Sequence, residues 1–347
     1  MLSRMIRASL AGGLACLLVA HASSARAHGP REVNVIPIAG GDSDLGIGGG
    51  AVGDIAELTD ERPGFRWRLE AAAFVTFKEQ EGSLIVPSND DYLELLVPRV
   101  GPEGRLHVDA RLSFTDERTL KYTGLGNASP PLPGDVRLGE YRRLHPTASL
   151  EVRARIARSF FLLAGTAFTY NRISVGDGTI LARDLATGPP DVRAQLGSFA
   201  PHGVELLTVE AQIDTRDDEI ITQSGQFHTL RFRLSPHVGA ALPYGYERLT
   251  GTARFYATPS PRWLSFKVRL VGDLLWGEPP FYELSRFDET PALGGGKAVR
   301  GVPAQRYYGK VKVFGNFEAV SQLVPFTLKK KHLMLGVAAF FDAGRTW

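Results

Sequence analysis

Apolar and polar side chains alternate along most of the chain with a period of two residues. From Phe65 to Phe77 every odd-numbered residue is apolar, and Arg66, Arg68, Glu70 and Thr76 lie between them. The same alternation returns in stretches that begin near residues 105, 148, 207 and 264. Because successive side chains of a strand point to opposite faces, each stretch predicts a β-strand with one apolar face and one polar face.

Three features favour a transmembrane barrel over a soluble sandwich, whose strands alternate in the same way. The strands predicted from these five stretches have about 9 to 13 residues, longer than average strands and long enough to cross a bilayer at a tilt. Short connections such as 100–104 alternate with long ones such as 176–202 and 277–305. Aromatic residues, among them Trp67, Trp263 and Trp276, gather near strand ends. These features are typical of outer-membrane barrels, in which polar residues line a wet interior, or lumen, and apolar residues contact lipid.

The predicted fold is therefore an all-β, transmembrane antiparallel β-barrel. We predict about thirteen strands, with boundaries good to a few residues. They lie near residues 33–39, 45–57, 65–77, 92–100, 105–115, 147–157, 159–172, 204–216, 226–235, 248–258, 262–276, 306–320 and 332–343. Bacterial single-chain barrels have an even number of strands. Either the count is wrong by one or the barrel lacks its last strands.

Residues 1–27 are predicted to be a secretory signal peptide, and residues 28–347 a single barrel domain. Arg4 and Arg7 precede an apolar stretch that ends at Ala25-Arg26-Ala27. The only cysteine, Cys16, lies in this segment, where a lipoprotein cleavage site is the weaker alternative. Removing the three signal arginines from 40 basic residues leaves 37, against 37 acidic ones, so the mature chain is formally neutral. This balance argues against a nucleic-acid partner.

No motif in the chain indicates an enzyme. The sequence contains neither G-x-S-x-G nor H-E-x-x-H, and its histidines are scattered. Gly48–Gly53 matches G-x-G-x-x-G, but no helical pattern follows, so a glycine-rich strand is the better interpretation. We predict no catalytic residue, no metal site and no cofactor.

Two stretches near the carboxyl end carry a resemblance to a known family. Leu293–Asn316 reads LGGGKAVRGVPAQRYYGKVKVFGN and contains the loop glycines Gly294, Gly295 and Gly296. Phe340–Gly344 reads FFDAG. Together they resemble the BamA/TamA-type outer-membrane barrel superfamily, also called the bacterial surface antigen barrel, whose members have sixteen strands.

The resemblance implies that a long outer loop folds back into the lumen. Its V-R-G motif matches Val299, Arg300 and Gly301, and Glu318 and Asp342 match the family's acidic residues on the next two strands. Alternation independently places both acids on the lumen side. We call these five residues the lumen-loop latch. The resemblance implies that Arg300 binds the acids, as a guanidinium can bind a carboxylate through two hydrogen bonds. The alternative is an arginine in a solvated outer loop.

The chain departs from the family in three respects. Val302 stands where an aromatic residue is usual, which is expected to loosen the packing of the loop tip. Too few residues separate Ala27 from the first strand for a periplasmic POTRA domain. The family has three more strands after the one that matches FFDAG. We therefore expect a sixteen-strand type of barrel without its last strands.

The expected role is outer-membrane biogenesis, through insertion or translocation of protein or lipid, in the envelope of a Gram-negative bacterium. The expected partners are outer-membrane lipids and lipopolysaccharide, with unfolded outer-membrane proteins or lipids as clients. The alternative, which the lack of a POTRA domain favours, is a passive pore or a structural barrel that inserts no client.

Overall fold

The computed structural model describes residues 31–42, 45–60, 64–131, 133–219, 221–260, 264–287, 298–328 and 331–347. The predicted signal peptide and the loop glycines Gly294, Gly295 and Gly296 lie outside these residues. All strands belong to one antiparallel sheet. They are β1 (Arg31–Asp42), β2 (Gly46–Leu58), β3 (Phe65–Gln80), β4 (Ser83–Ile85), β5 (Ser88–Val100), β6 (Leu106–Lys121), β7 (Glu140–Leu144), β8 (Thr147–Ala157), β9 (Phe160–Val175), β10 (His202–Asp214), β11 (Gly225–Ser235), β12 (Tyr246–Ser260), β13 (Leu264–Gly277), β14 (Val311–Leu328) and β15 (Lys331–Thr346).

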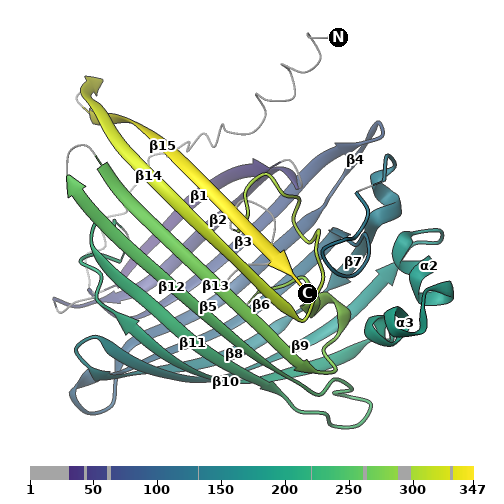
Figure 1. Cartoon of the computed structure of the whole chain (residues 1–347). Coiled ribbons are helices and arrows are strands. Elements are labelled where there is room, and N and C mark those ends of the chain that lie inside the picture. Colours follow the sequence, from purple (N-terminus) through teal and green to yellow (C-terminus); the bar gives the residue numbers. More distant parts are fainter. Residues whose placement is uncertain are drawn as a thin grey trace.

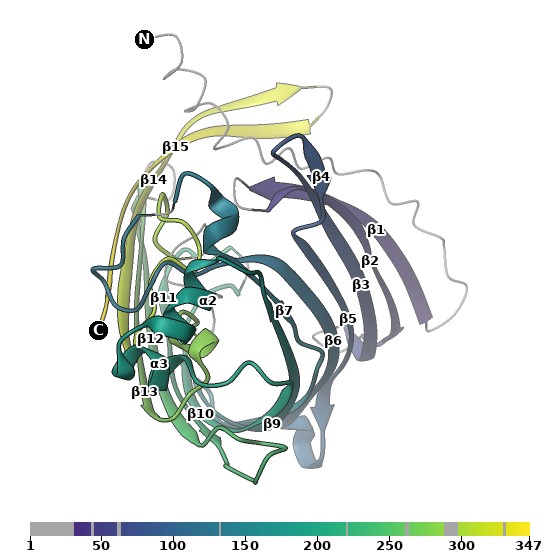
Figure 2. The same cartoon turned by 90° about the vertical axis from the view of Figure 1, so that its right-hand side faces the viewer.

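The sheet curls into an open barrel, which Figure 1 shows from the side and Figure 2 along its axis. Its path, β1-β2-β3-β5-β6-β7-β9-β10-β11-β12-β13-β14-β15, has thirteen positions, as the alternation predicts. β7 and β8 share one position because both pair with β6 and β9. The break between them contains Pro146, which has no N–H to donate to the sheet. Within the described residues, β1 and β15 pair with neighbours on one side only, so a seam separates them.

The strand faces follow the predicted alternation. On β10, Leu207 and Val209 are about half exposed on the outer face, whereas Thr208 and Glu210 are buried on the inner face. None of the described helices is long and apolar enough to cross a membrane.

The long connection predicted over residues 277–305 differs from the prediction at its end. We expected a strand over 306–320, but β14 begins at Val311 and continues to Leu328. Arg306, Tyr307 and Tyr308 belong instead to the preceding loop, where Tyr308 is completely buried. Polar and aromatic residues can alternate both in a strand and in a loop that packs against the inside of the barrel. The pattern alone therefore could not distinguish a strand from a loop here.

The long connections fold over one end of the barrel. They contain α2 (Ile180–Thr187) and α3 (Pro190–Leu196), with the short helical turns η2 (Val136–Gly139) and η3 (Phe281–Leu284); η1 (Pro102–Gly104) lies in a short connection. Figure 1 shows α2 and α3 at this end, on the right. A buried apolar cluster joins these segments, and we call it the cap. Its members include Tyr122, Tyr141, Leu181, Leu196, Phe281, Tyr282, Leu284 and Tyr308.

The cap corrects the expectation of a lumen that is wet along its whole length. Asp273 and Lys312, which occupy lumen-facing positions of the alternation, are completely buried under it. Such charges are tolerated away from water only when they are paired and hydrogen-bonded. The inner face at this end is therefore a packed ionic layer.

Candidate functional site

Arg300 lies inside the barrel against its last two strands. Its Nε and Nη2 donate to the two carboxylate oxygens of Asp342, at 2.6 and 2.7 Å, and its Nη1 donates to Glu318. The guanidinium carbon also lies 3.8 Å from the centroid of the Phe340 ring. The structure therefore brings Arg300 together with both acids of the predicted latch.

Strand register explains why the acids converge. Asn316 is paired with Asp342, and Glu318 with Phe340, so the four side chains form two neighbouring rows on the inner face. Asn316 Nδ2 donates to Asp342 Oδ1 at 2.9 Å and to the backbone oxygen of Ala298 at 2.7 Å. The wall thus holds both the arginine and the backbone two residues before it.

Hydrogen bonding and charge act together on Arg300. Its backbone N–H also donates to Asp342, at 3.0 Å. The hydrogen bonds that the Arg300 guanidinium donates to Asp342 raise its pKa further above the ordinary value, with a smaller contribution from Glu318. The arginine is therefore a permanent cation, and its single positive charge is shared by the two acids.

The residues next to Arg300 anchor the loop by packing. Val299 is buried in a small cluster with Val271, Phe287 and Phe314. Val302 packs against the same cluster, as does Tyr307. Valine at the usual aromatic position therefore still contacts the wall.

Gly301 turns the loop tip. Its φ is 82°, a conformation that residues with a side chain rarely adopt. The turn lets the chain leave the wall directly after Arg300.

A second ionic site, which the sequence analysis missed, lies under the cap. Glu283 of η3 accepts a hydrogen bond from Arg248 Nη1 at 2.8 Å. Arg248 Nε lies 3.1 Å from Asp273 Oδ1, and Lys312 Nζ lies 2.8 Å from Asp273 Oδ2. Arg143 lies 3.8 Å from the other oxygen of Glu283 and over the Tyr282 ring. We call Arg143, Arg248, Asp273, Glu283 and Lys312 the cap network.

The cap network holds Glu283 in its charged form. Burial alone would raise the pKa of Glu283, but Arg248 and Arg143 outweigh it and lower the pKa from 4.5 to about 2. The connection that carries the latch is therefore bound to the strands at Glu283 as well as at Arg300.

The described residues hold no cluster of three or more His, Cys, Asp or Glu side chains suited to a metal ion. At both sites, ion pairs bind one loop to the inner face of the barrel.

Comparison with known proteins places the fold. No family model and no curated protein matches the sequence. Among solved structures, the chain is similar to BamA from Haemophilus ducreyi lacking POTRA domains 1–3, with a TM-score of 0.59 and 12% sequence identity. The match covers 92% of this chain and 58% of that one. At this identity the likeness concerns the fold, and it confirms the BamA-type barrel that the V-R-G and FFDAG stretches indicated.

Proposed function

We propose that this chain, which has the fold of a BamA-type barrel, is an outer-membrane protein that assists the insertion or translocation of protein or lipid. The observation that carries the proposal is the binding of Arg300 to Glu318 and Asp342. Through it the lumen-loop latch joins the inner loop to β14 and β15, beside the seam. A latch at this position keeps the loop out of the seam and fixes the geometry of the edge strand.

The seam offers a route for a client. An unpaired strand edge presents free backbone N–H and C=O groups, which can pair with another extended chain. Among the strands that the structure describes, β1 and β15 both present such an edge. The strands of an unfolded outer-membrane protein need backbone hydrogen-bond partners. Such a protein is therefore the client that this chemistry favours.

The cap weighs against the alternative of a passive pore. Ring contacts join its segments, with Tyr122 and Tyr308 centroids 5.2 Å apart, and the ionic layer below it is buried. A solute would have to displace both layers.

The proposal is tested in liposomes that contain the purified protein. A urea-unfolded outer-membrane protein is added, and its folding is followed by the shift of its unheated band on a gel. We expect faster folding than in empty liposomes, and a slower rate with Arg300→Ala. Arg137→Ala is the control, because Arg137 forms exposed ion pairs with Asp135 and Glu81. A folding rate equal to that of empty liposomes, with a large steady conductance in planar bilayers, would support the passive pore instead.

A further inference from the structure

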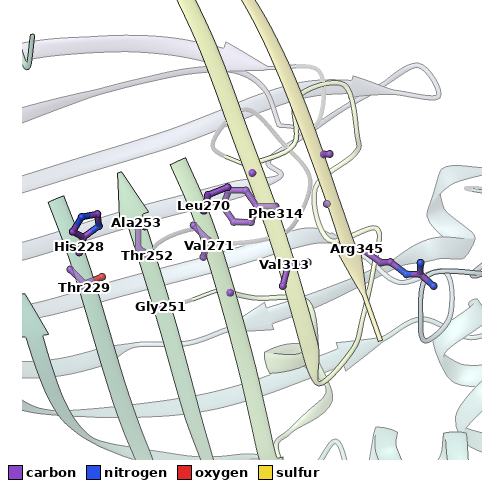
Figure 3. A pocket seen from close by; sticks show the side chains of 14 residues that line it. His228, Thr229, Gly251, Thr252, Ala253, Leu270, Val271, Val313, Phe314 and Arg345 are labelled. Carbon is purple, nitrogen blue, oxygen red and sulfur yellow. The ribbon is translucent and has the colours of Figure 1, made fainter. Parts of the chain in front are cut away.

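An apolar groove crosses the outer face of β11 to β15. Its volume is about 750 Å³, within the range of about 300–1,000 Å³ that is typical of small-molecule sites. Figure 3 shows His228 and Arg345 at the two ends of its lining. The groove has a floor of small residues, namely Gly251, Ala253, Gly272, Gly315 and Ala343.

Strand register aligns this floor. Gly251 is paired with Gly272, Gly272 with Val313, and Val313 with Arg345. Leu270 and Val313, which stand beside the glycines, are 53% and 40% exposed, so they project outward. The groove therefore lies on the face that a membrane barrel turns towards lipid.

The backbone does not require glycine at two positions of the floor. A Cβ built on Gly251 would come no closer than 3.8 Å to its neighbours, and one on Gly272 no closer than 4.0 Å. Glycine within a strand costs about 0.5–1 kcal/mol relative to alanine. Since a side chain would fit at both positions, the glycines serve to leave space above the sheet.

A cation and an aromatic ring stand at one end of the groove. Arg345 is exposed, and its guanidinium carbon lies 4.9 Å from the centroid of the Trp347 ring. Among the described residues, no carboxylate forms an ion pair with Arg345. Trp276 and Trp347 are each about half exposed at this end of the barrel. Exposed tryptophans of this kind mark the boundary between hydrocarbon and headgroups.

The dimensions of the groove match one lipid leaflet. From β11 to β15 there are four spacings between strands, or about 19 Å. With strands tilted by about 45°, the groove covers about 13 Å along the membrane normal, close to half of the 30 Å hydrocarbon core. An acyl chain can thus follow the groove while its headgroup stays beside Arg345.

We propose that this groove binds one acyl chain of lipid A, the phosphorylated glycolipid of the outer leaflet, with a phosphate bound by Arg345. The long connections lie at the Arg345 end, and in outer-membrane barrels long connections face the cell exterior. A guanidinium is well suited to bind a phosphate through two hydrogen bonds. This inference rests on the proposed outer-membrane location.

Native mass spectrometry of the refolded protein in micelles, with purified lipid A added, tests the inference. We expect the wild type to retain one lipid A, and Gly272→Leu, which fills the floor, to lower retention about tenfold. Ala164→Leu is the matched control, because Ala164 is exposed on β9, away from the groove. Gly251→Leu is a second floor variant, and each variant is first checked for its folded band on an unheated gel.

The charge is tested separately. Arg345→Gln should lower retention about tenfold, whereas Arg172→Gln, which changes another exposed arginine at the same end of the wall, should not. Equal retention of phosphatidylglycerol, or equal losses in the control variants, would overturn the assignment. If the wild type inserts into liposomes but retains no lipid A, the groove inference alone fails. If it does not insert, the proposed function fails and the inference with it.

Discussion

Neutralising Asp273 should destabilise the protein far more than deleting one of its hydrogen bonds. Asp273 is completely buried and is paired with Lys312 at 2.8 Å and with Arg248 at 3.1 Å. Asp273→Asn preserves the size of the side chain but removes the carboxylate that pairs with Arg248 and Lys312. Both cations stay buried, and Glu283 is then the acid of the cap network that they share. Removing one partner of a buried ion pair costs about 3–5 kcal/mol. We expect the free energy of unfolding to fall by that amount.

Three further variants, Thr250→Val, Lys312→Met and the double variant Asp273→Asn with Lys312→Met, define what the charge itself contributes. Thr250 donates a 2.6 Å hydrogen bond to the same carboxylate, so Thr250→Val should cost only about 1 kcal/mol. Adding Lys312→Met to Asp273→Asn removes one of the unpaired cations. The double variant should therefore lose at least about 1 kcal/mol less than the sum of the two single changes.

Urea unfolding in micelles, followed by tryptophan fluorescence, measures the free energy of unfolding of the wild type and of the four variants. If Asp273→Asn costs no more than Thr250→Val, the buried charges are not coupled as the distances imply. Additive losses in the double variant would refute the reasoning equally, because the cost would then not come from an unpaired cation.

Three other predictions use the same unfolding measurement. The pKa of Glu283 is lowered on folding from 4.5 to about 2, so its stabilisation is complete above pH 4.5 and is lost as the pH falls towards 2. The free energy of unfolding should fall by about 3 kcal/mol over this range, and Glu283→Gln should remove this part of its pH dependence. A Glu283→Gln variant with the pH profile of the wild type would contradict the prediction. Arg300→Lys should cost about 1 kcal/mol, since lysine cannot bind a carboxylate as a planar fork, and an equal stability would show that the fork is dispensable. Gly309→Ala should cost about 1–3 kcal/mol, because its Cβ would lie 2.1 Å from Thr346 Oγ1, whereas Gly272→Ala should be neutral or stabilising; equal effects would argue against the clash.

Alternation predicted the strands of the barrel because each strand residue faces either the lumen or the exterior. That rule placed Glu318 and Asp342 on the inner face correctly, although it says nothing of which loop residue they bind. Arg300 was found through the resemblance of its V-R-G motif, and its contacts with the wall then followed from the register of β14 and β15.

The cap network could not be found in this way. Glu283 lies in a connection without periodicity, and its partner Arg248 is 35 residues away in the sequence. The alternation of apolar and polar residues predicts only that Asp273 and Lys312 face the lumen. Their burial depends on where the connection folds, which is a tertiary outcome that no local pattern contains.

The cap has a consequence for the order of folding. Tyr308 donates a hydrogen bond to the backbone oxygen of Lys121 across a separation of 187 residues, and Arg306 reaches Thr123 across 183. Contacts so distant in sequence form slowly, because the chain between them must first be ordered. The strands from β7 to β13 lie between these partners in the sequence, so we expect these bonds to form late and the capped end of the barrel to close after its strands have paired.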